Sequence, residues 1–264
     1  MAQSGSLEHV LYEVDGAVAT VTLNRPEQRN AVGVQTLREL RTALAKAKED
    51  ASVRVVILTG AGDKAFSAGA DLAGFAADAT ETHRHAERGL FVELFLDMQR
   101  LGKPILGCIN GHALAGGLGI ALSCDLLVAA DTATFGTPEI RVGLWPMMIM
   151  SIVTRNIGRK RALQLFMTGE RIDAKTALEW GAVNRVVPAA DVRATTAEWA
   201  AQLARWSPLI MQLGRDAFYD IDGLGFEAAL RHLQSELTIV SLSEDFREGV
   251  TAFLQKREPD FKGR

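Results

Sequence analysis

A glycine-rich stretch at residues 110–121 (NGHALAGGLGIA) offers backbone N–H groups that could bind an oxygen carrying negative charge. It lies between an apolar run at 104–109, which predicts a buried strand, and a segment at 120–124, which predicts a buried helix. A turn of this kind directs unpaired N–H groups toward one place. Because Gly116 and Gly117 carry no side chains, a ligand can approach that backbone closely. The stretch therefore predicts one half of an oxyanion hole.

Glu139 follows a predicted helix start in an apolar neighbourhood, and an acid/base role for its carboxyl group is one of two interpretations. Thr137 and Pro138 are typical of an N-cap and a first helical position. Burial would raise the pKa of the Glu139 carboxyl, whereas the helix N-terminus would lower it. The sequence leaves this balance open. The alternative is a glutamate that only stabilises the start of the helix.

The composition of the 264-residue chain is that of an ordinary globular protein, with 48% apolar and 23% charged residues. This apolar share is enough for a sizeable core in one large domain or two small ones. The net charge of −3 gives no basic excess that would suggest a nucleic-acid partner. Residues 1–10 have neither the basic nor the apolar region of a signal peptide, and no apolar run is long enough to span a membrane. We therefore expect a soluble, cytoplasmic protein.

No metal site and no disulfide are expected from the histidines and cysteines. Cys108 and Cys124 lie in apolar runs, which predicts two buried thiols. His83 and His85 fall two residues apart on a predicted helix, so their side chains do not share a face. A solvated or lid-like helix is the simpler interpretation of their segment, residues 78–100.

Strand-like and helix-like segments alternate in the first part of the chain, and helices dominate the last third. The Asp15-Gly16 pair joins two strand-like runs and predicts a β-hairpin. Strands are predicted at residues 9–14, 18–23, 53–58, 104–109, 125–130 and 182–187, and helices at 34–47, 78–100, within 147–214 and within 216–257. This order predicts a parallel sheet of βαβ units followed by a helical extension, in one domain.

Four segments resemble the crotonase (enoyl-CoA hydratase/isomerase) superfamily, in the order and at the separations usual for it. They are residues 23–31 (LNRPEQRNA), 65–72 (AFSAGADL), 110–119 (NGHALAGGLG) and 135–139 (FGTPE). The ending at residues 252–262 is also similar, so the resemblance covers nearly the whole chain. Either glycine loop alone is equally well explained as a tight turn, but the ordered set is specific.

The resemblance implies an α/β fold, a spiral of ββα repeats at residues 1–200, with a C-terminal helical trimerisation region of the same domain at 201–264. It also implies acyl-CoA thioester substrates and a homotrimer, or a dimer of trimers. Coenzyme A would be part of the substrate, and no separate cofactor and no metal are expected. We expect neither a nucleic-acid partner nor a membrane partner.

The resemblance also implies roles for individual residues. The backbone N–H groups of Ala70 and Gly116 would donate to the thioester oxygen as it gains charge. The substrate-contacting residues would be Arg29, Ala31, Ala68, Asp71, Leu72, Gly117, Trp145 and Met148, with Phe253 and Lys256 supplied by a neighbouring subunit. Arg29 suits a phosphate, and Met148 belongs to a methionine-rich segment that we expect to shape the acyl pocket. The alternatives are a solvated loop arginine, plain core packing of the methionines, and an ordinary helix face at Phe253 and Lys256.

The chain departs from the pattern of the family's hydratases at Gly119. Those enzymes usually carry two catalytic glutamates, and the first would fall at Gly119, whereas the second is retained as Glu139. One carboxylate suits isomerisation of 3-enoyl-CoA to 2-enoyl-CoA, which needs a proton shuttle and an oxyanion hole. Hydration stays open if a water, His112 or Asp131 replaces the missing group, although His112 is better explained as a structural histidine. A CoA-thioester hydrolase or decarboxylase, or a non-catalytic acyl-CoA-binding protein, are further alternatives.

Overall fold

A six-stranded sheet forms the frame of the part of the chain that the computed structural model describes, residues 7–71 and 80–264. Its strands are, in spatial order, β1 (Val10–Asp15), β2 (Val18–Leu23), β3 (Val55–Gly60), β5 (Ile105–Ile109), β7 (Leu126–Ala130) and β10 (Arg185–Val187). The β1–β2 hairpin is antiparallel, and all other neighbours are parallel. Every residue of β3 and β5 is buried, which explains their continuous apolar sequences.

A second sheet of four short strands lies beside the first and was not expected from the sequence. Its order is β4 (Ala65–Ser67), β6 (His112–Leu114), β8 (Thr134–Gly136) and β9 (Arg171–Asp173). β4, β6 and β8 are parallel, so their carboxyl ends lie at one edge, and β9 runs antiparallel to β8. This edge positions the candidate site.

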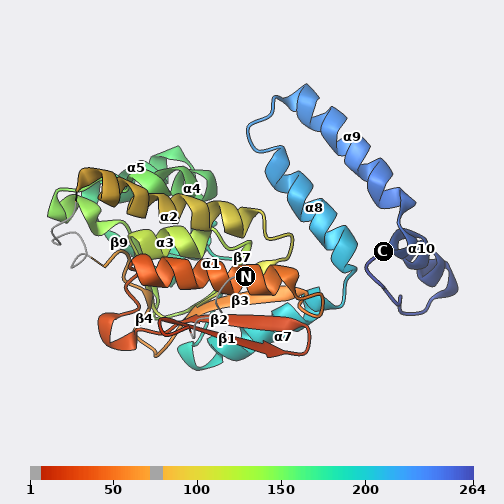
Figure 1. Cartoon of the computed structure of the whole chain (residues 1–264), viewed down its shortest axis with the longest axis horizontal. Helices are drawn as coiled ribbons and strands as arrows, with labels where there is room; N and C mark the ends of the chain where they lie inside the picture. The colour runs from red at the N-terminus through yellow and green to blue at the C-terminus, as the bar shows by residue number, and fades with distance from the viewer. Residues whose placement is uncertain (1–6, 72–79) are drawn as a thin grey trace.

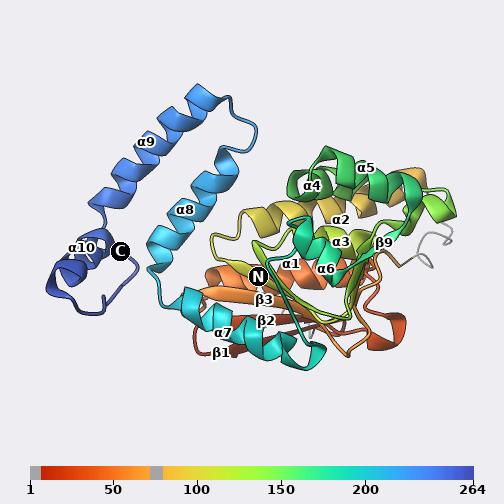
Figure 2. The same cartoon turned by 180° about the vertical axis from the view of Figure 1, so that it is seen from behind.

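Helices cover both faces of the six-stranded sheet (Figures 1 and 2). α1 (Val34–Glu49) packs on β1, β2 and α2 (Glu81–Gln99), while α7 (Val192–Ala204) packs on β3, β5 and β7 from the other side. α3 (Gly116–Leu122) lies against α4 (Met147–Ile157), which in turn contacts α5 (Arg159–Thr168). The shorter elements are α6 (Ala174–Glu179) and the 3₁₀ turns η1 (Pro26–Gln28), η3 (Pro138–Val142) and η4 (Ala189–Asp191).

The last three helices project from the core as an arm (Figure 1). They are α8 (Pro208–Asp220), α9 (Phe226–Leu242) and α10 (Glu244–Gln255). The expected boundary at residue 200 falls inside α7, and the arm begins after that helix ends. An α/β fold with a helical C-terminal region is thus confirmed, while the numerical division at residue 200 stays a prediction.

Buried hydrogen bonds around Asp125 fasten the arm to the core. Arg215 on α8 is only 8% exposed and donates to Asp125 Oδ2 at 2.9 Å. It also donates to the carbonyl oxygens of Gln99 at 2.6 Å and Met98 at 2.7 Å, at the end of α2. The hydroxyl of Tyr219 donates to Asp125 Oδ1 at 2.7 Å. One turn of α8 therefore docks onto the core through charged and polar groups rather than through apolar packing alone.

Two local expectations are corrected. α3 begins at Gly116 rather than near residue 120, because the glycines themselves form its first turn. The turn after Thr137 is a five-residue 3₁₀ helix, and the Thr137 side chain does not cap it. Among residues 7–71 and 80–264, no helix is both long and apolar enough to cross a membrane.

Candidate active site

Three loops leave the small sheet at the same edge and carry the predicted catalytic groups. Ala70 follows β4 by three residues, Gly116 follows β6 by two, and Glu139 follows β8 by three. The register pairs Leu114 with Gly136, so the ends of β6 and β8 are level. The carboxyl ends of neighbouring parallel strands are where ligand sites gather in α/β folds. The topology therefore brings these three groups together, although Ala70 and Glu139 are 69 residues apart in the chain.

The loop that carries Ala70 depends on Gly69. Gly69 has φ +98°, and a Cβ there would lie 2.6 Å from Ala115 Cβ and 2.9 Å from Leu114 O. Val32 N–H donates to Gly69 O at 2.8 Å, and Asp71 N–H donates to Val32 O at 3.1 Å. In such a bridge the N–H of the intervening residue, Ala70, faces away from Val32. The Ala70 N–H is thus directed away from its own pairing partner, on a loop that touches the second glycine turn.

The second glycine turn holds Gly116 through a strained residue. Ala115 has φ 50° and ψ −130°, an uncommon conformation for a residue with a side chain, and its N–H donates to Gly136 O at 2.9 Å. Gly116 then starts α3, where N–H groups have no partner inside the helix. A Cβ at Gly116 would lie 3.7 Å from Ala70 N. Within the described residues neither the Ala70 nor the Gly116 N–H donates a hydrogen bond, so both can serve one ligand oxygen.

Glu139 presents a buried carboxylate oxygen at this edge. Among the residues that the structure describes, Glu139 Oε2 has no hydrogen-bond partner and is shielded from solvent. Burial raises the pKa of Glu139 above its ordinary value, against a smaller lowering by a backbone hydrogen bond. The balance that the sequence left open is therefore decided by burial. The Glu139 carbonyl accepts a 3.0 Å bond from Leu144 N–H, which closes the loop that carries it.

An apolar wall faces the two glycines of α3. A Cβ at Gly116 would lie 3.2 Å from the ring of Phe91, and one at Gly119 would lie 3.2 Å from Phe95 Cζ and 2.9 Å from Ile149 Cβ. The two rings, both on α2, are 6.0 Å apart. The space that the side chain of a glutamate at position 119 would need is therefore occupied by the hydrocarbon side chains of Ile149 and Phe95.

The two proposed substitutes for that glutamate are hydrogen-bonded elsewhere. Nδ1 of His112 lies 2.9 Å from Thr134 Oγ1 within the small sheet. Asp131 is exposed, and its Oδ1 accepts a 3.1 Å bond from Ala189 N–H. Burial lowers the pKa of His112, and the nearby Arg171 and Arg29 charges lower it further. His112 is accordingly a neutral, hydrogen-bonded side chain near neutral pH.

A cation-lined cavity of about 320 Å³ lies beside the Ala70 loop. Arg29 and Ala68, both expected to bind CoA, line it together with Lys64, His112, Leu114 and Arg171. Ala68 N–H donates to Arg29 O at 2.9 Å, which ties the two loops together. Asp63 also lines the cavity, but its negative charge is outnumbered by the three cations. Guanidinium and ammonium groups are the usual protein partners of phosphate oxygens.

Ala31 and Asp71 share one partner, Arg25. The Arg25 guanidinium donates to Ala31 O at 2.8 Å and contacts Asp71 Oδ2 at 3.1 Å from both terminal nitrogens. The same guanidinium also bonds the Gln28 side chain. Arg25 thus clamps the segment that follows Ala70 to the loop that follows β2.

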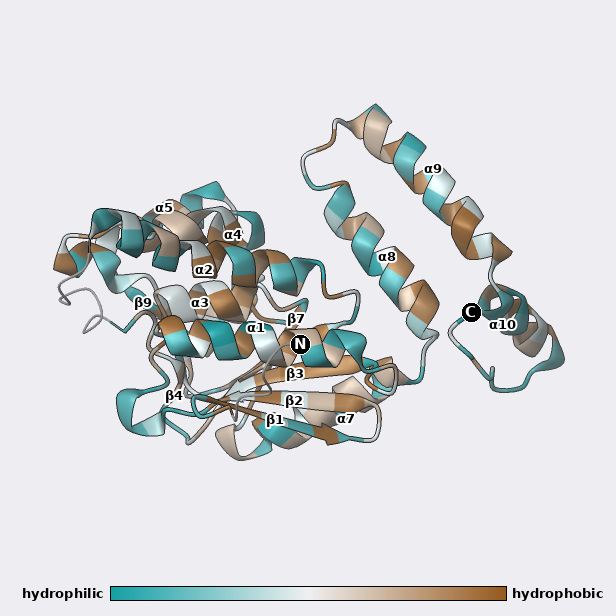
Figure 3. Cartoon of the chain, in the orientation of Figure 1, coloured by the Kyte–Doolittle hydropathy of each residue, from teal (hydrophilic) through white to brown (hydrophobic). Residues whose placement is uncertain are grey.

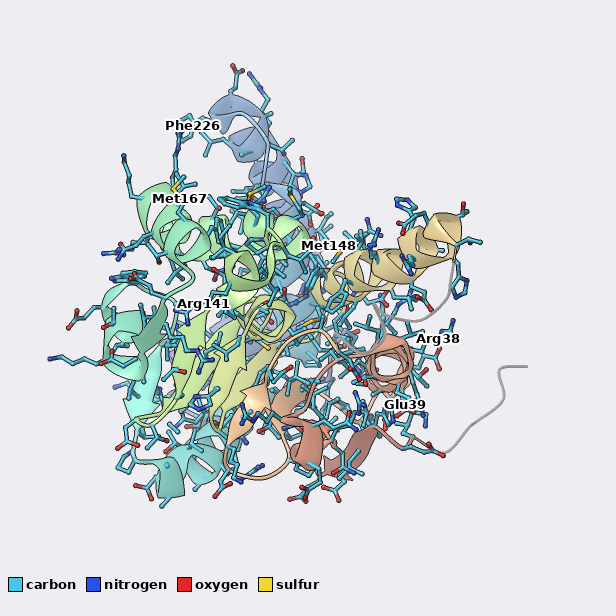
Figure 4. All side chains as sticks on the ribbon, turned by 90° about the vertical axis from the view of Figure 1, so that its left-hand side faces the viewer. Arg38, Glu39, Arg141, Met148, Met167 and Phe226 are labelled. Atoms are coloured by element: carbon cyan, nitrogen blue, oxygen red, sulfur yellow. The ribbon has the colours of Figure 1, made fainter. Side chains whose placement is uncertain are left out.

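The remaining predicted residues have different surroundings. A Cβ at Gly117 would lie 2.6 Å from Ser67 O, so this glycine lets α3 pack directly on β4. Trp145 packs edge-on against Phe166. Met148, near the start of α4, is 38% exposed (Figure 4), and its role in shaping an acyl pocket stays a prediction.

Three of the residues predicted to contact substrate lie away from this edge or outside the described residues. Phe253, 82% exposed, and Lys256, which follows α10, lie at the end of the arm, far from the small sheet (Figure 1). The structure does not bring them to the Ala70–Gly116 site of their own chain, so contact from a neighbouring subunit stays a prediction. Leu72 lies outside the described residues.

Several residues at the site were missed by the sequence analysis. The apolar ones, Phe91, Phe95 and Ile149, have helical spacing that any core residue shares. Arg25 stands in a quoted motif, but only the fold shows that it reaches Asp71. Arg171 comes from a strand too short to be recognised. Lys64 directly precedes β4, a weak signal that could have marked it.

Comparisons with known proteins agree with this geometry. The family model described as "Enoyl-CoA hydratase/isomerase" matches residues 13–264. The chain is 36% identical over 248 residues to the 2,3-dehydroadipyl-CoA hydratase of Escherichia coli, covering 94% of this chain and 96% of that protein. It is 34% identical to the short-chain-enoyl-CoA hydratase of Clostridium acetobutylicum, covering 98% and 99%.

A solved structure resembles the chain in both sequence and fold. The enoyl-CoA hydratase from Bacillus anthracis superposes with a TM-score of 0.92 at 34% identity, covering 97% of this chain and all of that one. The family match spans almost the whole chain, including all three loops at the edge of the small sheet. The chain is a member of the enoyl-CoA hydratase/isomerase family of the crotonase superfamily, and it is an enzyme of that type.

Proposed function

We propose that this enzyme isomerises 3-enoyl-CoA esters to 2-enoyl-CoA esters, with Glu139 as the single acid/base. The observation that carries the proposal is the contrast between two positions. Glu139 has a buried, unpartnered carboxylate oxygen and a raised pKa, whereas Gly119 is packed against Ile149 and Phe95. A carboxylate whose pKa moves toward neutrality is well suited to taking and returning a proton.

In the proposed mechanism the Glu139 carboxylate takes a proton from C2 of the 3-enoyl thioester. The C2–H bonding electrons move into a dienolate, whose thioester oxygen accepts hydrogen bonds from the N–H groups of Ala70 and Gly116. The protonated Glu139 then gives the proton to C4, and the double bond ends between C2 and C3. No water is consumed and no electron leaves the substrate. None of these steps uses a metal or a separate cofactor.

The cation-lined cavity supports binding of the CoA part of the substrate. Arg29, Lys64 and Arg171 supply positive charge beside Ala68, two residues before the proposed oxyanion donor Ala70. Phosphates bound there would place the pantetheine arm near the two glycine loops. Phe91, 7% exposed, then covers Gly116 with hydrocarbon, which strengthens hydrogen bonds to the developing oxyanion by excluding water.

Hydration of 2-enoyl-CoA is the second candidate, because the relatives compared above are named hydratases. Hydration needs one group to activate water and another to handle the proton delivered to carbon. His112 and Asp131 are engaged with Thr134 and Ala189. On this geometry a hydratase would have to rely on Glu139 and an ordered water.

We further propose that the enzyme assembles as a homotrimer through the arm. The chain exposes 14360 Å², whereas a compact monomer of this size exposes about 11,000 Å². Apolar residues recur along the arm (Figure 3). Those with exposed large side chains include Phe218, Phe226, Leu237, Leu242, Phe253 and Leu254. Exposed apolar surface on this scale is typical of an interface. Light scattering at micromolar concentration should give three times the chain mass, or six times for paired trimers; a monomer would contradict the proposal.

The reaction is tested by incubating the enzyme with a panel of 2-enoyl-CoA and 3-enoyl-CoA esters. Products are identified by mass spectrometry. Isomerisation leaves the mass unchanged, hydration adds the mass of water, hydrolysis releases free CoA, and decarboxylation loses the mass of carbon dioxide. We expect 3-enoyl-CoA esters to give 2-enoyl-CoA esters without added water. A hydrated product as the main outcome would favour the second candidate, and binding without turnover across the panel would contradict both.

A further inference from the structure

The side chain of Ile149 occupies the space into which any side chain at position 119 would have to extend. A Cβ built at Gly119 would lie 2.9 Å from Ile149 Cβ and closer still to Ile149 Cγ2. We propose that Ile149 is the residue that determines reaction outcome, by filling the place of a second carboxylate and its water. The inference rests on the proposed isomerase function and names the residue that excludes hydration.

Ile149 has little freedom to move aside. It is 3% exposed and lies on the buried face of α4, in line with Val153 and Ile157. A β-branched side chain has essentially one χ1 rotamer in a helix, so Cγ2 cannot swing away. The second obstacle, Ile149 Cβ, is bonded directly to the α4 backbone. Relief of the contact would therefore require α3 and α4 to separate.

The same packing leaves no partner there for a water molecule. A buried water needs two to four polar partners. The nearest groups to the Gly119 Cβ position are hydrocarbon, from Ile149 and Phe95. The Gly119 carbonyl already accepts a 2.8 Å bond from Ser123 Oγ and a 3.1 Å bond from Ser123 N–H. Ile149 thus removes both the room and the polar environment that a second acid/base would need.

The test is to install the second glutamate with and without Ile149. Gly119→Glu alone should lower the melting temperature and hydrate 2-enoyl-CoA only at a background rate. Gly119→Glu combined with Ile149→Gly should relieve the clash. This double variant should hydrate 2-enoyl-CoA about 10²-fold faster than Gly119→Glu alone, the usual gain from one general acid/base. The matched control is Gly119→Glu with Val153→Gly, which also deletes a fully buried branched side chain from α4 but leaves Ile149 in place.

Three results would overturn the role of Ile149. In the first, Gly119→Glu alone hydrates 2-enoyl-CoA as fast as the double variant Gly119→Glu with Ile149→Gly. In the second, the control Gly119→Glu with Val153→Gly hydrates it as fast as that double variant. In the third, the double variant with Ile149→Gly folds but does not hydrate 2-enoyl-CoA. If the glutamate variants do not fold, the melting temperature of Gly119→Ala tests whether Ile149 blocks a side chain at position 119. An unobstructed Gly→Ala change in a helix raises stability, so a lower melting temperature supports the proposal and an equal or higher one overturns it.

The wild-type enzyme, rather than the variants, tests the proposed isomerase function. If the wild-type enzyme hydrates 2-enoyl-CoA or does not isomerise 3-enoyl-CoA, the isomerase proposal is wrong. If the wild-type enzyme isomerises and Gly119→Glu alone hydrates, only the role of Ile149 is wrong. The wild-type product panel is therefore run beside every variant.

Discussion

At the scale of the residue, the proposed chemistry depends on one carboxylate, of which one oxygen has no hydrogen-bond partner among the described residues. A buried carboxylate oxygen normally finds a hydrogen bond, and an exception marks a functional group more often than a structural one. Glu139 Oε2 is such an exception within the described residues. The cost of burying it is visible in its raised pKa.

Replacement of Glu139 by glutamine should lower kcat for isomerisation by about 10²–10⁴-fold, because the amide cannot exchange a proton with C2 or C4. Binding of a CoA ester, followed by calorimetry, should stay close to that of the wild-type enzyme. Glu179→Gln is the matched control, since Glu179 is exposed on α6. Wild-type kcat in the Glu139→Gln enzyme would rule out the assigned role.

The same substitution should stabilise the fold at neutral pH, because it removes a buried charge. Burial raises the folded-state pKa of Glu139 above its unfolded value. Ionisation therefore destabilises the native state, fully at pH above the folded pKa and not at all below the unfolded one. We expect Glu139→Gln to raise the free energy of unfolding by about 0.5–2 kcal/mol at pH 8, the usual size of a single stabilising substitution that costs activity. Denaturant titrations should show the gain shrinking as the pH falls toward 4.5, and a gain independent of pH would contradict this account.

At the scale of the element, three strands of three residues each set the geometry of the site. Parallel pairing makes the ends of β6 and β8 level and pairs the last residue of β4 with Ala113, one residue before the end of β6. A glycine or strained residue turns the chain after β4 and β6. Arg25 then holds the Ala70 segment through Asp71. The proposed oxyanion hole would thus be a property of the small sheet and its turns, rather than of one glycine motif.

Gly69→Ala should cost both stability and rate. A side chain is strained at φ +98°, and its Cβ would meet Ala115 Cβ at 2.6 Å, so the Ala70 N–H must shift. Loss of one oxyanion donor lowers kcat by about 10²–10³-fold. The control is Gly181→Ala, at φ +81° with nothing within 4 Å of its Cβ, which should cost about 1–3 kcal/mol of stability from backbone strain alone but leave kcat unchanged. Equal kcat losses in the two variants, measured at saturating substrate, would argue against the assignment.

The large elements could be predicted from the sequence, whereas the small sheet could not. The Asp15-Gly16 hairpin and the apolar runs of β3, β5 and β7 carry strong local patterns. β4, β6, β8 and β9 have three residues each, too few to show a period, and exist because of their tertiary pairing. Gly116, Ala70 and Glu139 were found through ordered motifs. Ile149 was not, because its contact with Gly119 arises only when α4 packs on α3.

At the scale of the whole molecule, a compact catalytic core carries a helical arm that exposes apolar faces. The arm meets its own core through Arg215, whose guanidinium bonds Asp125 and two carbonyl oxygens at the end of α2. These bonds hold α8 in one orientation while leaving α9 and α10 free of the core (Figure 1). The apolar faces of α9 and α10 are then available for a second copy of the chain.

Arg215→Ala should destabilise the protein by about 3–5 kcal/mol, because it leaves the Asp125 carboxylate without its buried charge partner and removes the guanidinium from the Gln99 and Met98 carbonyl oxygens. Arg155→Ala is the matched control. Its ion pair with Asp222 is exposed and should contribute less than about 1 kcal/mol. Chemical denaturation at a fixed protein concentration separates the two. Similar losses in both variants would mean that the arm does not depend on the Arg215 contact.

The most direct measurement follows one atom of hydrogen through the reaction. A 3-enoyl-CoA ester deuterated at C2 is converted in ordinary water, and the product is examined by NMR and mass spectrometry. A single base that moves the proton from C2 to C4 predicts 2-enoyl-CoA with deuterium at C4, diluted only by exchange on Glu139, and no product from Glu139→Gln. A 3-hydroxyacyl-CoA as the main product, or the same labelled product from Glu139→Gln, would contradict the account.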